Sequence, residues 1–268
     1  MAGNLIISTI NGQAIGVKNA IINGNFAVNQ RGVSGTVVLS AGAYGHDRWK
    51  AGASGCTYTF ATSANVTTIT ITAGSLIQVI EGVNLYTDTY TLSWSGTAQG
   101  KIGAGSYSGS GVTGSVTGGS NLNIEFNTGT LSLVQLEAGT VASPFERRDY
   151  GRELMMCQRY CYSITAETGQ TPIIGMGLWN SGTDVRIYVP MKVTMRTTPT
   201  TSLSSASHFQ ALYASVAWRA ISSVASVTES GVNGVSLLLN TSGSGSQGQG
   251  TELTTASSSA LMLFTAEL

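Results

Sequence analysis

The side chains that could carry catalysis in this sequence are few and scattered. Hydrolysis requires two placed carboxylates, or a nucleophile beside a base. Neither His46 nor His208 lies in a G-x-S-x-G motif or in another nucleophile context. Most acidic residues outside the middle of the chain are isolated: Asp88, Glu125, Glu167, Asp184, Glu229 and Glu252. The sequence therefore predicts a protein that is not an enzyme.

The three cysteines do not form a recognisable metal or disulfide motif. Cys157 and Cys161 are four residues apart, at helical spacing, and a disulfide within one helical turn has poor geometry. Neither histidine is close enough in sequence to complete a zinc set. We therefore expect Cys56, Cys157 and Cys161 to be reduced and packed, in preference to a redox or metal role. We expect no metal and no cofactor.

Four aromatic residues are candidates for binding a carbohydrate: Trp49, Trp94, Tyr107 and Trp179. An aromatic face packs against the C–H groups of a sugar ring, while nearby polar side chains hold its hydroxyls. Tyr107 lies in the glycine-rich stretch 102–119, which has no phosphate-loop lysine and which we expect to be an exposed hairpin tip.

Core packing is the alternative interpretation for the first two tryptophans, and the sequence favours it. Trp49 follows Asp47 and Arg48, which would hold sugar hydroxyls in one interpretation and would brace the loop as an ion pair in the other. Trp94 shares one strand face with Tyr90 and Leu92, as core residues commonly do.

Alternation with a period of two predicts β-strands through most of the chain. In the first half the pattern covers residues 56–61, 66–73, 76–81, 89–96 and 121–127, with glycine and serine turns between them. In the second half it covers residues 170–179, 184–193, 235–239 and 261–268. The segment 209–227 fits a helix or strands, and its β surroundings favour strands. We therefore predict an all-β protein with two antiparallel, jelly-roll-like β-sandwiches.

The stretch 131–162 differs from the rest of the chain, because it carries eight formal charges in a protein that is only 10% charged. After Tyr150 the apolar spacing changes from that of a strand to that of a helix, with Leu154, Cys157 and Cys161 on one face. The change predicts a short helix that joins the two sandwiches.

The overall composition limits the classes of partner. The 268 residues include 34 glycines, and 13 basic and 13 acidic side chains cancel to a net charge of zero. The chain therefore lacks the basic surface typical of nucleic-acid binding. It also lacks a long apolar run and an N-terminal secretory signal, so we expect no membrane insertion and a protein made in the cytoplasm.

Several segments resemble one family. The run VQLEAGTVASPFERRDYGRELMMCQRYCY, residues 134–162, resembles a segment of phage tail-fibre and related virion proteins. AIINGNFAVNQRG, HDRWKAG, VPMKVTMRTTPT and the terminal LFTAEL agree with the same proteins in order. The resemblance implies a first domain like a carbohydrate-binding module.

The resemblance also implies a domain organisation. It comprises a jelly roll at 20–146, a helical junction at 147–165, and a C-terminal sandwich at 166–268 that could be a receptor-binding tip. Residues 1–19 precede the resembling part of the chain, and we expect them to be an arm for virion attachment or, as the alternative, a loosely ordered terminus or an extra edge strand. The resemblance further implies a homotrimer, in which the junction residues could pack between subunits or within one chain. These residues are Arg147, Arg148, Arg152, Glu153, Leu154, Cys157 and Cys161.

The predicted function is that of a tail fibre or head fibre on the virion exterior, which contacts other virion proteins and attaches to host surface glycans. Many weak contacts from several copies would supply the strength of attachment. The alternative is a capsid decoration or tail adaptor protein that binds no sugar, because a fold does not by itself carry a function.

Overall fold

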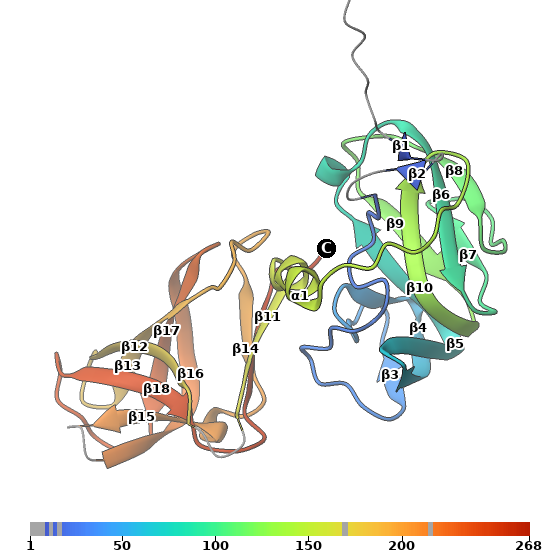
Figure 1. Cartoon of the computed structure of the whole chain (residues 1–268). Coiled ribbons are helices and arrows are strands. Elements are labelled where there is room, and N and C mark those ends of the chain that lie inside the picture. Colours follow the sequence, from blue (N-terminus) through green and yellow to red (C-terminus); the bar gives the residue numbers. More distant parts are fainter. Residues whose placement is uncertain (1–8, 11–12, 15–17, 168–170, 214–216) are drawn as a thin grey trace, which may run out of the picture. The chain divides into compact units, whose positions relative to one another are not determined.

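A computed structural model describes residues 9–10, 13–14, 18–167, 171–213 and 217–268 (Figure 1). The described chain is all-β apart from one α-helix and two short 3-10 turns, as the strand pattern predicted. It forms two compact units, the first from Met1 to Leu154 together with Leu268, and the second from Met155 to Glu267. No helix in the described part is long and apolar enough to cross a membrane.

The first unit contains one antiparallel sheet of eight strands. Its main path joins β3 (Val37–Leu39), β4 (Trp49–Ser63), β5 (Val66–Ile80), β10 (Gly129–Ala138), β6 (Asp88–Ser95) and β8 (Val112–Val116). β9 (Leu122–Phe126) pairs with the end of β5 and also with β7 (Gly100–Ile102). A 3-10 turn (Gly82–Asn84) follows β5. Before the sheet, β1 (Thr9–Ile10) pairs with β2 (Gln13–Ala14), so most of the predicted arm lies outside the described residues.

The strands β5 and β10 change partner along their length, and this folds the sheet around a single core. The start of β5 pairs with β10, and its end pairs with β9. Residues Gly129 to Leu131 of β10 pair with β5, whereas Ser132 to Ala138 pair with β6. A register shift between Ser132 and Gln135 lies next to this change of partner, and Leu133 within it has a φ of 51°. Such bulges bend a strand and redirect its pairing.

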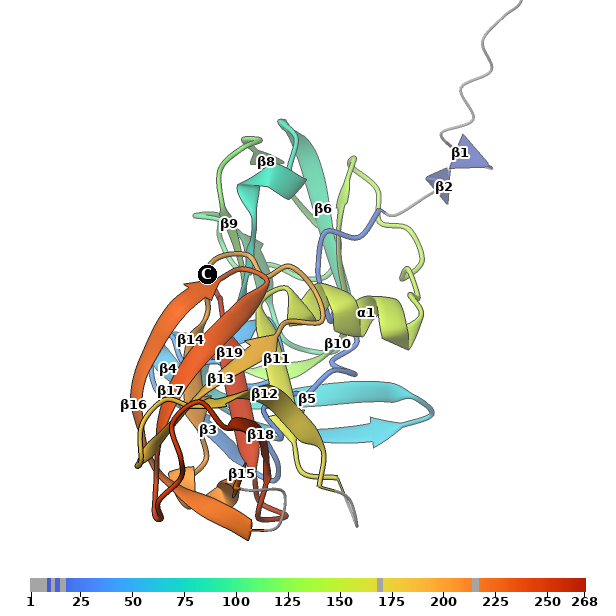
Figure 2. The same ribbon diagram turned by 90° about the vertical axis from the view of Figure 1, so that its left-hand side faces the viewer.

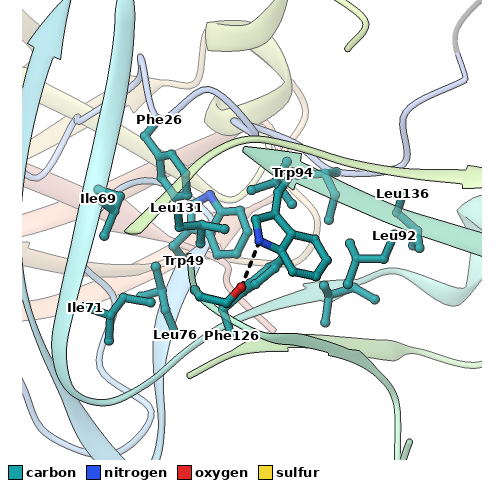
Figure 3. Packing of buried hydrophobic residues seen from close by; sticks show 14 of the residues in the cluster. Phe26, Trp49, Ile69, Ile71, Leu76, Leu92, Trp94, Phe126, Leu131 and Leu136 are labelled. Atoms are coloured by element: carbon teal, nitrogen blue, oxygen red, sulfur yellow. Dashed lines mark hydrogen bonds between the residues drawn. The ribbon is translucent and has the colours of Figure 1, made fainter. Parts of the chain in front are cut away.

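Aromatic rings fill the centre of the first unit (Figure 3). The Phe126 ring lies between two tryptophans, with centroid distances of 6.1 Å to Trp49 and 5.0 Å to Trp94. Both indole N–H groups donate to backbone carbonyls, that of Trp49 to Asn23 at 3.0 Å and that of Trp94 to Ala98 at 3.0 Å. Buried indoles with satisfied N–H groups are stable core residues.

The second unit is built around a closed antiparallel barrel, which corrects the prediction of a second sandwich. The strands follow the order β12 (Ile173–Trp179), β13 (Asp184–Pro190), β17 (Gly234–Thr241), β16 (Ala217–Gly231), β15 (Phe209–Tyr213) and β18 (Gly250–Thr255). The long strand β16 joins two neighbours in this ring: its residues Ala217 to Ala220 pair with β15, and the rest of the strand pairs with β17 through three register shifts. Bulges of this kind curve a sheet until its ends meet. The strand interpretation of the ambiguous segment 209–227 is confirmed by β15 and β16.

A three-stranded sheet accompanies the barrel. It has the order β11 (Cys161–Thr165), β19 (Leu261–Thr265) and β14 (Thr200–Leu203), and a 3-10 turn (Ala206–His208) follows β14. The helix α1 (Tyr150–Gln158) is shorter than the predicted junction at 147–165. Cys161 pairs with Thr265 in the sheet, so this tertiary pairing overrides the helical spacing of the cysteines. All three cysteines are buried, and none of them forms a disulfide.

Candidate functional site

Three of the four predicted sugar-binding aromatics are core residues. Trp49 and Trp179 are 0% exposed and Trp94 is 7% exposed. Trp179 lies inside the barrel unit, and its indole N–H donates to the Leu212 carbonyl at 3.2 Å. A fully enclosed ring has no face left for a ligand. The structure therefore assigns Trp49 and Trp94 to packing, as the sequence favoured, and places Trp179 in the core in place of the expected sugar site.

The residues before Trp49 hold the protein's own backbone. Asp47 accepts hydrogen bonds from the Gln30 backbone N–H at 2.6 Å and from its side-chain amide at 2.7 Å. Arg48, with a φ of 72°, donates to the Val79 carbonyl at 2.6 Å. Both residues are buried, so these groups fix loops of the first unit and are not positioned to hold sugar hydroxyls.

Tyr107 is the predicted aromatic that remains partly exposed, and it belongs to a closed polar cluster. Glu125 pairs with the Lys101 ammonium at 2.9 Å and accepts the Ser75 hydroxyl at 2.6 Å, while the Lys101 nitrogen lies 4.8 Å from the Tyr107 ring centroid. Burial and the neighbouring Glu125 carboxylate raise the pKa of Tyr107 to about 12. Burial opposes ionisation of Glu125, but hydrogen bonds from Ser75, Lys101 and Tyr107 outweigh it and lower the pKa of that carboxyl. The cluster therefore braces the glycine-rich loop.

A cavity of about 330 Å³ lies elsewhere in the first unit and is the better candidate for a binding site. Its volume is at the lower end of the range for small-ligand sites, which begins at about 300 Å³. Three segments contribute its lining: the loop after Asn23, the β4–β5 hairpin, and the chain that leads into α1. The lining residues are Asn25, Ala27, Thr62, Asn65, Thr67, Arg148, Tyr150 and Glu153.

The loop after Asn23 is held by the buried Asn23 side chain. Its amide donates to the carbonyls of Val28 at 2.8 Å and Asp47 at 3.0 Å, and its side-chain oxygen accepts the Val28 N–H at 2.9 Å. Gly24 is required beside it, because an added Cβ would lie 2.2 Å from the Val134 carbonyl oxygen. This rigid turn places Asn25 and Ala27 at the cavity.

The β4–β5 hairpin supplies three neutral polar side chains, and Figure 2 shows its two long strands. Ala64 and Asn65 have φ values of 48° and 59°, and two consecutive left-handed residues are characteristic of a type I′ hairpin turn. The hydroxyls of Thr62 and Thr67 are 2.8 Å apart across the two strands. The turn therefore fixes both hydroxyls and the Asn65 amide near one another.

An ion-pair network holds the third segment. The Arg148 guanidinium lies 3.4 Å from Glu153 and 3.6 Å from Glu146, and its side chain is only 4% exposed. It also donates to the carbonyls of Ile21, at 2.9 Å, and Asn19. These contacts fix the backbone on both sides of Tyr150, whose side chain is 57% exposed and lines the cavity.

The carboxylates of this network bind backbone N–H groups of the segment that precedes Asn23. Glu146 accepts from Lys18 at 3.0 Å and from Asn19 at 2.8 Å, and Glu153 accepts from Asn23. Arg148 and Glu153 therefore hold the junction within one chain, as one of the two alternatives for these residues expected. Arg147 and Arg152 are exposed, Leu154 is partly buried, and Cys157 and Cys161 are buried.

The cavity can form hydrogen bonds but has no metal-binding set. In the described ranges no group of three or more His, Cys, Asp or Glu side chains could hold a metal ion. The amides, hydroxyls and exposed phenol ring suit a polyhydroxylated ligand. Sequence reasoning missed Asn25, Thr62, Asn65, Thr67 and Tyr150 as site residues, because nothing local in the sequence marks them as neighbours.

Comparison of the sequence with protein-family models and with curated proteins found no match in either case.

Proposed function

We propose that this chain is a non-enzymatic virion fibre protein, on the tail or the head of a phage, that attaches to host surface glycans as a homotrimer. The observation that carries the proposal is the cavity of the first unit, where neutral amides and hydroxyls surround the exposed ring of Tyr150. The resemblance of residues 134–162 to virion fibre proteins supports the same function.

The choice of Tyr150 as the sugar platform follows from its exposure and its surroundings. A sugar ring that packs on this phenol would have amide and hydroxyl groups within the same cavity for its own hydroxyls. A single shallow site of this kind binds weakly, so several copies on one particle would be needed for firm attachment.

Substitution of Tyr150 by alanine is expected to weaken glycan binding at least tenfold, because the sugar ring loses the aromatic side chain on which it packs. The measurement is binding of the purified full chain to an immobilised glycan panel. Tyr86→Ala is the matched control, since Tyr86 is 80% exposed on the same unit and does not line the cavity. Equal binding by wild type and Y150A would overturn the assignment of this site.

Homotrimer formation is a separate expectation of the proposal. Light scattering of the purified chain should give a mass of about three times 27.7 kDa. A monomeric mass at the concentrations used for binding would remove the trimer from the proposal and would leave the glycan site to be judged by its own assay.

A structural role as a capsid decoration or tail adaptor is the second candidate. It is favoured by the burial of Trp49, Trp94 and Trp179, which removes three expected sugar platforms. Absence of binding to every glycan on the panel, together with normal assembly into particles, would support this second function.

A further inference from the structure

We infer that the cavity selects neutral sugars and discriminates against sugars that carry a carboxylate, such as sialic and uronic acids. This inference rests on the proposed glycan-binding function and names its ligand class. It follows from how the charged side chains around the cavity are already used.

Arg148 is the one cation of the cavity lining, and its donors are already engaged. One terminal nitrogen donates to Ile21 and to Glu153, at 2.9 Å and 3.4 Å. The other donates to the Asn19 carbonyl and lies 3.6 Å from Glu146. The remaining Nε is enclosed and has no partner. Arg148 therefore has no accessible pair of N–H groups with which to bind a ligand carboxylate in the usual bidentate manner.

The positive charge of Arg148 is already compensated by its partners. Its guanidinium pairs with two carboxylates, Glu146 and Glu153. Glu153 also lines the cavity, and it contacts Asn23 and Arg148 through Oε1. The other carboxylate oxygen, Oε2, can accept a hydrogen bond from a sugar hydroxyl, whereas its negative charge would repel an anionic ligand.

The remaining polar groups of the lining are neutral and suit hydroxyls. Asn25 and Asn65 each offer an amide donor and an acceptor, and Thr62 and Thr67 each offer a hydroxyl. A sugar hydroxyl is itself both donor and acceptor, so it can pair with any of these groups. An anionic ligand would gain no charge pairing from them.

The test compares matched sugars that differ in one carboxylate. Glucose and glucuronic acid, and galactose and galacturonic acid, are coupled at equal density to the same support and are probed with the purified full chain. We expect at least tenfold weaker binding to each acid than to its neutral partner. Binding to the neutral member should change less than twofold between about 50 mM and 500 mM salt, because no ion pair contributes to it.

A charge variant tests the cause of the selectivity without touching the buried network. Thr62 is exposed at the hairpin, so Thr62→Lys can add a cation at the cavity, and Thr62→Gln is its uncharged control of similar length. Relative to T62Q, T62K should raise the ratio of acidic-sugar binding to neutral-sugar binding at least fivefold within each matched pair.

The outcomes separate this inference from the proposed function. Stronger binding to the acidic sugars than to the neutral sugars would overturn the inference, but the proposed glycan-binding function would still stand. Binding to none of the sugars, by wild type and T62K alike, would overturn both. Equal binding to each matched pair would show that the carboxylates do not select the ligand and would also overturn the inference.

Discussion

Replacement of Arg148 by methionine is expected to lower the free energy of unfolding of the first unit by about 3–5 kcal/mol. The guanidinium is buried between Glu146 and Glu153 and donates to the Ile21 and Asn19 carbonyls. Methionine retains much of the side-chain volume but leaves two carboxylates without their cation and two carbonyls without a donor. Removal of one member of such a network destabilises the protein by more than the intact ion pair stabilises it, because the remaining partners are left buried and unpaired.

Hydrogen–deuterium exchange at increasing urea concentrations can measure this loss of stability. The exchange is followed peptide by peptide, so the unfolding of each unit is observed separately. Peptides from β5 report the first unit, and peptides from β17 report the barrel as an internal control. Arg152→Met is the matched variant, since Arg152 is exposed on α1 shortly after Arg148, and we expect it to change stability by less than about 0.5 kcal/mol. A loss below about 1 kcal/mol for R148M would contradict the role assigned to the network.

Acidification from pH 6.5 to pH 4 is expected to remove up to about 3 kcal/mol of stability from the first unit through His46 alone. Burial lowers the pKa of His46 from 6.5 to about 4 in the folded protein. Its Nδ1 lies 2.9 Å from the Tyr58 hydroxyl, and the Phe60 ring packs edge-on at 4.6 Å. Between pH 6.5 and pH 4 the unfolded chain therefore binds a proton that the folded chain does not, and stability falls as the pH falls.

The contribution of His46 is measured as a difference, since carboxylates also titrate in this range. Urea unfolding is measured between pH 7 and pH 4 for wild type and His46→Gln. The free energy of unfolding reported by the β5 peptides should fall less steeply with decreasing pH in the variant than in wild type. His208→Gln is the control, because His208 lies in the second unit and should leave those peptides unchanged. Parallel pH profiles for wild type and H46Q would show that His46 does not titrate differently in the two states.

Strand content could be predicted from the sequence because it depends on local alternation. In β5, Ile69 and Ile71 point into the core while Thr68 and Thr70 do not, and this difference is visible in the order of the residues. The closed barrel could not be predicted in the same way. Its closure depends on bulges along β16, and a bulge adds a residue without a distinctive local pattern.

The candidate site was less predictable than the fold, for two reasons. Trp49 and Trp179 are of the residue type that commonly packs against a sugar ring, but the residue type does not show whether the indole is enclosed in the core. Asn25, Asn65 and Tyr150 are distant in sequence and meet only because a hairpin, a tight loop and the start of α1 converge. Arg148 was recognised as a junction residue, although its partners within the same chain became visible only in the folded structure.

Closure of the barrel also bears on how copies of the second unit behave when they are crowded together. An open sheet ends in rows of backbone N–H and C=O groups that can recruit a strand from another molecule and start edge-to-edge polymerisation. In the ring from β12 through β13, β17, β16 and β15 to β18, each strand is hydrogen-bonded on both sides. The barrel can therefore be held at high local concentration with little tendency to add strands from its neighbours.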